Sequence, residues 1–174
     1  SMTMVGFALT LWAASSLVGQ LVGGSLADQL GRKRLIVVSL GLSALLLPIF
    51  GFADQFFSAA AIAMLMGLAG AMYQPARDAM VADLVEPARR PRAYALVRVV
   101  SNLGIAIGPA IGGFLASRSY MLAFSASAAA TFLFFLVSAT MLHETKPSAP
   151  PHRAAEAPTG SFLSVLRNRP FMVF

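Results

Sequence analysis

Residues 4–26 read MVGFALTLWAASSLVGQLVGGSL, a run without a single charged side chain. A helix rises about 1.5 Å per residue, so about 20 apolar residues cross the roughly 30 Å hydrocarbon core of a membrane. Similar runs follow it along the chain: Leu35–Ala53, Phe56–Ala76, Tyr94–Ala116 and Tyr120–Leu142. Backbone amides in lipid need internal partners, and the runs do not alternate as barrel strands do. The sequence therefore predicts an all-α, polytopic membrane bundle with five visible spans.

Composition supports a membrane protein and disfavours most soluble classes. Apolar residues make up 57% of the 174 residues and charged residues only 11%, with a mean hydropathy of +0.74. Soluble domains average about 25% charged residues, so this chain lacks the polar surface of an ordinary soluble enzyme. It has no cysteine, and both histidines, His143 and His152, lie in a polar stretch rich in proline. We expect no catalytic residue, no metal site and no cofactor.

Basic residues predict the orientation. The net charge is +6, which in a soluble protein can indicate nucleic-acid binding but in an apolar chain is typical of cytoplasmic loops. Eleven of the 13 cations follow the first, third or fifth run, whereas Arg118 alone lies on the opposite side and Arg98 falls inside the fourth run. The positive-inside rule thus places three segments in the cytoplasm, and we predict a multi-pass protein of the cell membrane. We expect the lipid bilayer as a partner and no nucleic acid.

The sequence predicts three regions. Residues 1–143 form a transmembrane bundle, residues 144–160 form a proline-rich interdomain linker, and residues 161–174 form a surface helix and the start of a second bundle. A loosely ordered linker end is the alternative for the last region. Five spans place the amino terminus outside, yet nothing before Met4 directs its export. We therefore expect one more span before residue 1 and several after residue 174.

The loop after the first run carries a recognisable pattern, GSLADQLGRKRL at residues 24–35. It resembles the signature loop of the major facilitator superfamily, G-x-L-a-D-r-x-G-r-k-x-x-l, with Gln29 where an arginine is usual. Glycine permits close approach and tight turns, and an aspartate complements a helix amino terminus. The matching residues are Gly24, Leu26, Asp28, Gly31, Arg32 and Lys33. The resemblance implies two six-helix bundles, of which this chain would supply family spans two to six.

The fourth run contains a second pattern, GIAIGPAIGG at residues 104–113. It resembles the fifth-span motif of the family's drug:proton antiporters, g-x-x-x-G-P-x-x-G-G. Small residues at this spacing form one helix face that lets a neighbouring backbone approach, and proline removes a backbone hydrogen bond. We expect the face to act both in packing and in closure of one side of the transporter. Its residues are Gly104, Gly108, Pro109, Gly112 and Gly113.

Polar residues inside the runs are few. Arg98 and Asn102 share a face of the fourth run, and Gln20 lies in the first. An arginine at a span centre costs roughly 2.5–3.5 kcal/mol, so it usually faces a cavity or a partner. Arg98 is near the cytoplasmic end, however, and snorkelling is the alternative. All three are candidates for lining a polar pathway.

Two further expectations come from the resemblance. Acidic residues at the end of the fourth family span often pair with the signature loop, which points to an ion pair between Asp78 and Arg32; a plain solvated loop is the alternative. Antiporters of the family also often carry an arginine on that span in the pattern l-x-x-R-x-x-q-G, and here Ala63 occupies the aligned position. That departure weakens any assignment of a coupling proton.

Function is expected from the family and the scarcity of polar groups. The resemblance implies a secondary transporter that works by alternating access, with multidrug efflux in exchange for protons as the antiporter group's activity. Small amphipathic or hydrophobic compounds are the expected substrates. Uptake of a sugar or other polar metabolite is one alternative, and a membrane partner that transports nothing is another. The oligomeric state and the substrate's identity are left open.

Overall fold

Each apolar run is a single helix in the computed structural model, which describes residues 2–53 and 55–145. All five helices are long and apolar enough to cross a membrane, which confirms the predicted all-α membrane bundle. The predicted surface helix at 161–174, and the linker beyond Thr145, lie outside the described residues. The helices are α1 (Met2–Leu30), α2 (Arg32–Gly51), α3 (Phe56–Leu84), α4 (Arg90–Arg118) and α5 (Tyr120–Met141), with a short 3-10 turn η1 (Pro87–Arg89) before α4.

Three helices extend well beyond the apolar runs that predicted them, and α1 does so from Leu26 to Leu30. The α3 helix continues past Ala76 to Leu84, and α4 begins at Arg90 rather than Tyr94. Each has 29 residues, about 43 Å of helix against about 30 Å of hydrocarbon. A helix can continue beyond the membrane, because its backbone hydrogen bonds also form in water. The residues there include charged ones, so a search for apolar runs detects only the part of the helix that lies in lipid.

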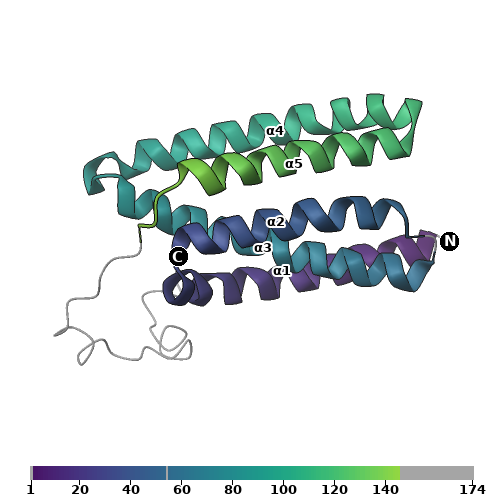
Figure 1. Ribbon diagram of the computed structural model, residues 1–174, viewed down its shortest axis with the longest axis horizontal. Coiled ribbons are helices and arrows are strands. Elements are labelled where there is room, and N and C mark those ends of the chain that lie inside the picture. The colour runs from purple at the N-terminus through teal and green to yellow at the C-terminus, as the bar shows by residue number, and fades with distance from the viewer. Residues whose placement is uncertain (1, 54, 146–174) are drawn as a thin grey trace, which may run out of the picture.

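The five helices lie along one common direction (Figure 1). The α1 helix packs along α3, α2 packs against both α3 and α5, and α4 contacts mainly α5. The Gly31 turn, η1 and the end of α5 lie at one end of the bundle, here called the basic end. The α2–α3 and α4–α5 connections lie at the opposite end.

The tightest helix contact lies between α1 and α3 and depends on glycine. A Cβ on Gly19 would lie 2.6 Å from the carbonyl oxygen of Leu68, and one on Gly67 would lie 2.6 Å from that of Trp12. Ser16 bridges the same contact, because its hydroxyl donates to the Gly67 carbonyl oxygen at 3.3 Å. Small residues in membrane helices permit such close backbone approach. This crossing is therefore the small-residue contact that holds α1 on α3.

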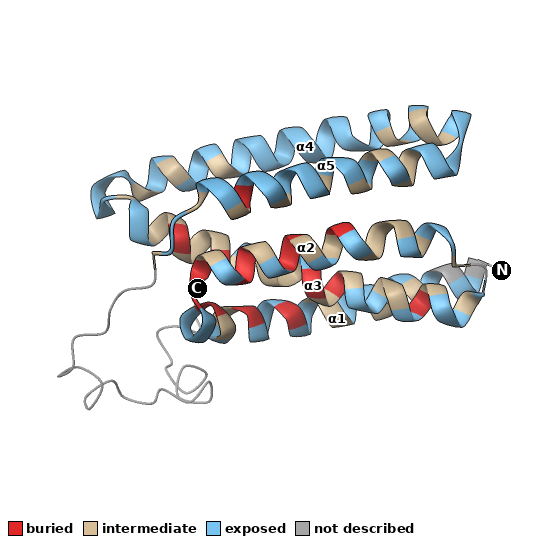
Figure 2. Ribbon diagram, in the orientation of Figure 1, coloured by how far each residue is buried: buried red, intermediate tan, exposed pale blue. Residues whose placement is uncertain are grey.

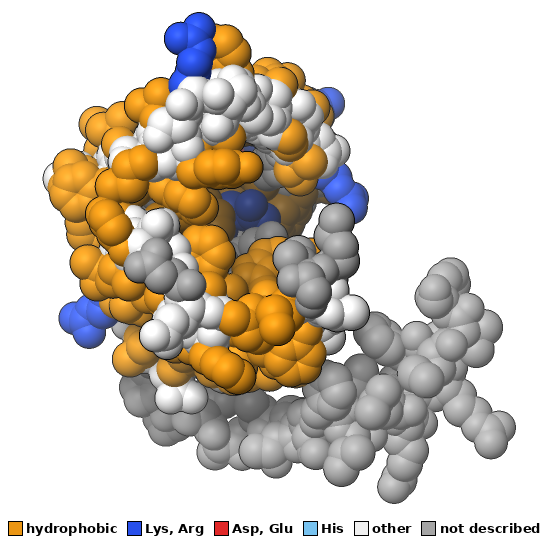
Figure 3. Space-filling view, turned by 90° about the vertical axis from the view of Figure 1, so that its right-hand side faces the viewer, with side chains coloured by type: hydrophobic (Ala, Val, Ile, Leu, Met, Phe, Trp, Pro, Cys, Tyr) orange, Lys and Arg blue, Asp and Glu red, His pale blue; other side chains and the backbone are white. Residues whose placement is uncertain are grey.

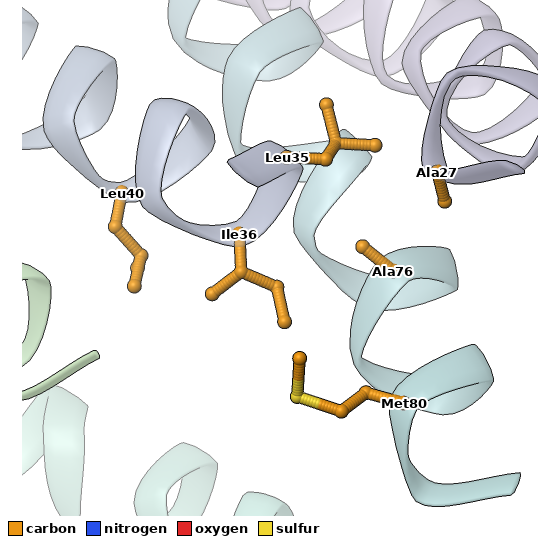
Figure 4. Packing of buried hydrophobic residues seen from close by; sticks show 6 residues of the cluster. All are labelled: Ala27, Leu35, Ile36, Leu40, Ala76 and Met80. Atoms are coloured by element: carbon orange, nitrogen blue, oxygen red, sulfur yellow. The ribbon is translucent and has the colours of Figure 1, made fainter. Parts of the chain in front are cut away.

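A buried apolar cluster lies toward the basic end (Figure 4). Its members come from α1, α2 and α3, and their side chains converge on the space between these helices. They are Ala27, Leu35, Ile36, Leu40, Ala76 and Met80. The cluster fixes the first turn of α2 against the ends of α1 and α3.

The α4 helix has no buried residue within the described chain, and Figure 2 shows it exposed along most of its length. Its apolar side chains include Ile105, which is 71% exposed, and Phe114, which is 63% exposed. A membrane supplies the apolar surroundings that such a surface requires.

Candidate functional site

Gly31 forms the turn between α1 and α2 with a backbone conformation suited to glycine. Its φ of 102° lies in the left-handed range, where a side chain is strained. A Cβ at this position would also collide with the carboxylate of Glu144. Two independent reasons thus favour glycine at position 31: its backbone angle and the lack of space for a side chain beside Glu144.

Glu144 supplies the first turn of α2 with a hydrogen-bond acceptor from far along the chain. Its Oε1 accepts hydrogen bonds from the backbone N–H groups of Arg32, at 2.8 Å, and Lys33, at 3.4 Å. The first N–H groups of a helix have no partner within the helix, and a carboxylate also complements the positive end of its dipole. Glu144 therefore ties the segment after α5 to the signature loop.

Arg32 joins three helices through its guanidinium group. Its Nη2 lies 3.2 Å from Oδ1 of Asp28 on α1, and its Nε lies 3.0 Å from Oδ2 of Asp83 on α3. The second contact is an ion pair without hydrogen-bond geometry, since the buried Nε makes no hydrogen bond within the described residues. The Arg32 side chain is 11% exposed, which reduces solvent screening of both pairs.

The predicted partner of Arg32 is wrong, because Asp83 and not Asp78 occupies that position. Asp78 instead accepts from the neighbouring Arg77, whose Nε and Nη2 lie 3.0 and 2.9 Å from its Oδ1. The two aspartates are five residues apart on one helix, which turns them about 140° away from each other. Only Asp83 faces α2 at this level.

Thr145 completes the ionic cluster at the basic end. Its hydroxyl lies 3.2 Å from Oδ2 of Asp83 and its backbone N–H lies 3.1 Å from Oε1 of Glu144. The cluster consists of Asp28, Arg32, Asp83, Glu144 and Thr145, and we call it the Arg32 cluster. It connects α1, α2, α3 and the segment after α5 by ion pairs and by hydrogen bonds to carboxylates, outside the apolar runs.

The remaining signature residues divide between packing and exposure. Leu26 packs against the buried cluster, whereas the Asp28 side chain is 72% exposed and free to meet a further group. Gly24, expected to permit close helix approach, has open space around its Cβ position. The neighbouring Gly23 makes that approach instead, because a Cβ there would lie 2.9 Å from Cγ of Pro75. Within the described chain Gly23 makes this contact, and the role of Gly24 stays a prediction.

The glycines of the α4 motif lie on an open surface. A Cβ at Gly104, Gly108, Gly112 or Gly113 would meet nothing within 4 Å. The tight contact predicted for this face is absent from the described chain, and the role of the face in closure stays a prediction. Pro109 lies inside α4 among these glycines.

A polar cavity of about 400 Å³ lies between α3 and α4. It brings together Arg98 and Asn102, two of the predicted lining residues, whereas Gln20 lies elsewhere, exposed on α1. Other polar side chains at the cavity come from both helices: Gln74, Arg77, Asp78, Tyr94 and Ser101. The view along the helices from the opposite end shows a hollow with basic side chains visible deep inside it (Figure 3).

A second cavity, of about 640 Å³, is almost wholly apolar and lies toward the opposite end. Aromatic side chains from α1, α2 and α5 line it, including Trp12, Phe50 and Phe124, and the last two rings pack edge to face at 5.7 Å. Ala63 also lines it. The position aligned with the antiporter arginine therefore faces an apolar space here. Pockets of 300–1,000 Å³ with such linings are typical of sites for small organic molecules.

Sequence reasoning missed Glu144, Thr145, Asp83 as the partner of Arg32, and the aromatic residues of the apolar cavity. An acidic residue directly after the fifth run, opposite a basic loop, was the only signal for Glu144. Within residues 2–53 and 55–145, no three His, Asp or Glu side chains converge in a group that could hold a metal ion.

Comparisons with known proteins identify relatives. Residues 1–174 match the family model of the Major Facilitator Superfamily. The MFS-type transporter YhjO of Bacillus subtilis is 32% identical over 130 residues, which cover 75% of this chain and 32% of YhjO. The quinolone resistance protein NorA of Staphylococcus aureus is 27% identical over 144 residues, which cover 83% of this chain and 37% of NorA. The chain thus spans about a third of the length of these curated relatives.

Proposed function

Because the chain belongs to the major facilitator superfamily, we propose that it is part of a cell-membrane transporter that exports small amphipathic or hydrophobic compounds in exchange for protons. The apolar cavity carries this proposal. Its volume of about 640 Å³ and its aromatic lining suit an organic molecule with little polar surface. The likeness to a protein named for quinolone resistance supports export of drug-like compounds.

The Arg32 cluster is the part of this chain that would respond to alternating access. Its ion pairs hold the ends of α1, α2 and α3 together, while the exposed Asp28 carboxylate offers a charge to a group approaching from outside the described residues. Binding such a group would favour one of two arrangements of the bundle, as a transporter requires. The ion pairs of the cluster would then stabilise one of the two arrangements at the predicted cytoplasmic side.

Uptake of a polar metabolite is a second candidate, and the polar cavity favours it. Gln74, Arg98 and Asn102 bring amide and guanidinium donors to one space near the basic end. Hydrogen-bonding groups of this kind would fit a polar substrate at least as well as an apolar one.

Transport by inside-out vesicles tests the proposal and separates the two candidates. The full-length protein encoded by the gene is expressed, and accumulation of a lipophilic fluorescent dye and of a radiolabelled sugar panel is followed with an imposed proton gradient. We expect saturable dye accumulation that a protonophore abolishes, and no sugar accumulation above vesicles without the protein. Sugar accumulation in right-side-out vesicles, without dye accumulation in inside-out vesicles, would replace export by uptake, and movement of neither would overturn transport of both classes.

A further inference from the structure

Arg98 carries a positive charge that nothing in the described chain balances. The other arginine of the polar cavity, Arg77, is paired with Asp78 through two contacts of 3.0 and 2.9 Å and lies over the Tyr73 ring at 5.6 Å. Asp83, further along α3, is engaged by Arg32. Within residues 2–53 and 55–145, no carboxylate forms an ion pair with Arg98. The cavity therefore has a net positive charge.

The position of Arg98 makes this charge costly without a partner. It lies eight residues after the start of α4 at Arg90, about 12 Å along the helix axis. An α4 of about 43 Å, centred on a hydrocarbon core of about 30 Å, places Arg98 several ångströms inside that core. Arginines at such depth usually face a cavity or a counterion. Here the side chain lines the cavity between α3 and α4.

Neutral hydrogen-bonding side chains line the same cavity as the Arg98 guanidinium. Tyr94, Arg98 and Asn102 are each four residues apart on α4, so they share one helix face, and Gln74 faces them from α3. The Tyr94 hydroxyl is fixed, because it donates to the Asp78 carbonyl oxygen at 2.9 Å. Guanidinium and amide N–H groups together can hold both oxygens of a carboxylate or the oxygens of a sulfonate.

We propose that the polar cavity binds the acidic group of the transported compound, with Arg98 as its counterion. The substrates of the protein are then amphipathic organic anions, carboxylates or sulfonates. This inference rests on the proposed export function and narrows its substrate class. A lipid phosphate offers the same anionic chemistry, so the test separates the two sources.

Binding by the full-length protein in phosphatidylcholine nanodiscs tests the inference at pH 7. The probe is radiolabelled 1-naphthaleneacetate, and the competitor is 1-naphthaleneacetamide, which has the same ring without the charge. We expect the wild-type protein to bind the acid at least about tenfold more tightly than the amide, as for hydrogen bonds to charged groups. Equal affinity, or no binding of the acid, would overturn the inference without reference to any variant.

Variants then test whether Arg98 is the cation that binds the acid. Arg98→Gln should weaken binding of the acid about tenfold or more while leaving binding of the amide unchanged, and Arg98→Lys should lose less. Arg118→Gln is the matched control, because it removes a cation that stacks on Phe114 outside this cavity. Wild-type binding of the acid by Arg98→Gln, checked for an unaltered melting curve, would contradict the role of Arg98.

Two further measurements distinguish a bound substrate from a lipid headgroup, and the proposed substrate class from the proposed export function. Phosphatidylglycerol added to the nanodiscs should leave binding of the acid unchanged, and its displacement of the probe would assign the cavity to a lipid headgroup and overturn the substrate claim. Transport of uncharged compounds without preference for the acid would remove this inference but leave the export function in place. Binding of the acid with no transport of any compound would overturn the export function and, with it, the assignment of the bound anion as a transported substrate.

Discussion

The Nε atom of Arg32 lies 3.0 Å from Oδ2 of Asp83, so the first residue of α2 is ionically bound to the last turn of α3. The two residues are 51 positions apart, and the buried cluster beneath them holds their helices in register. Most of the Arg32 cluster is built around this pair. Because the Arg32 side chain is largely buried, loss of its partner leaves a poorly solvated charge.

Asp83→Asn should lower the stability of the bundle. Removing one partner of a fully buried pair costs roughly 3–5 kcal/mol, and the 22% exposure of Asp83 together with the second partner Asp28 reduces this to about 1–3 kcal/mol. Thermal unfolding in detergent, followed by circular dichroism, measures the change. Asp78→Asn is the matched control, since its carboxylate is 46% exposed and contacts only the adjacent Arg77 among ion pairs of the described chain. Equal effects of the two variants would contradict the assignment.

Gly31→Ala and Glu144→Ala should both destabilise the start of α2, for different reasons. The alanine at position 31 is strained at a φ of 102° and meets the Glu144 carboxylate, whereas loss of Glu144 leaves two N–H groups of α2 without their acceptor. Loss of a helix cap costs about 1 kcal/mol. Hydrogen exchange at the amides of Arg32 and Lys33 reports it directly. Glu144→Gln keeps an acceptor oxygen, so protection of these amides should fall less than in Glu144→Ala.

Gly67→Ala should destabilise the helix contact between α1 and α3. The added Cβ lies 2.6 Å from the Trp12 carbonyl oxygen, and overpacking of this kind typically costs about 1–3 kcal/mol. Gly108→Ala is the matched control within the described chain, since its Cβ position is open. Melting temperatures of the two variants measure the difference. A melting temperature unchanged by Gly67→Ala would show that the two helices do not cross as closely as described.

Cysteine labelling from one side of the membrane tests the predicted orientation. Gln29→Cys and Arg90→Cys, at the basic end, should react with a membrane-impermeant maleimide only in inside-out vesicles. Ser119→Cys, between α4 and α5 at the opposite end, should react only in intact cells. Labelling of Gln29→Cys and Ser119→Cys from the same side would contradict the five-span arrangement.

The sequence predicted the helices well because lipid imposes a length and a composition on each span. It predicted the Gly31 turn from a local pattern, and the structure adds the backbone angle that requires it. It could not predict that Asp83, and not Asp78, meets Arg32, because this depends on the rotation of α3 about its own axis.

Long-range contacts explain the other misses. Glu144 reaches Arg32 across 112 residues, and only the return of α5 to the basic end brings them together. Close helix approach occurs at Gly19, which belongs to no quoted pattern, and at Gly67, which aligns with the glycine of the l-x-x-R-x-x-q-G pattern. A motif thus indicates that small residues are needed in a helix, and the packing of the helices decides which of the glycines make the close contacts.

Transport by Asp28→Asn tests most directly our proposal that the Arg32 cluster responds to alternating access in a proton-driven export cycle. Initial rates of dye accumulation are measured in proteoliposomes that hold equal amounts of folded full-length wild-type, Asp28→Asn or Glu86→Gln protein under an imposed proton gradient. In this proposal the exposed Asp28 carboxylate meets a group outside the described residues, so its neutral amide should reduce the rate about tenfold or more, as expected for a coupling of about 1–3 kcal/mol. Glu86→Gln should keep most of the wild-type rate, because the Glu86 carboxylate is exposed, pairs with the exposed Arg89 and lies outside the polar cavity. A wild-type rate for Asp28→Asn would contradict the claim and leave the cluster as a structural contact alone.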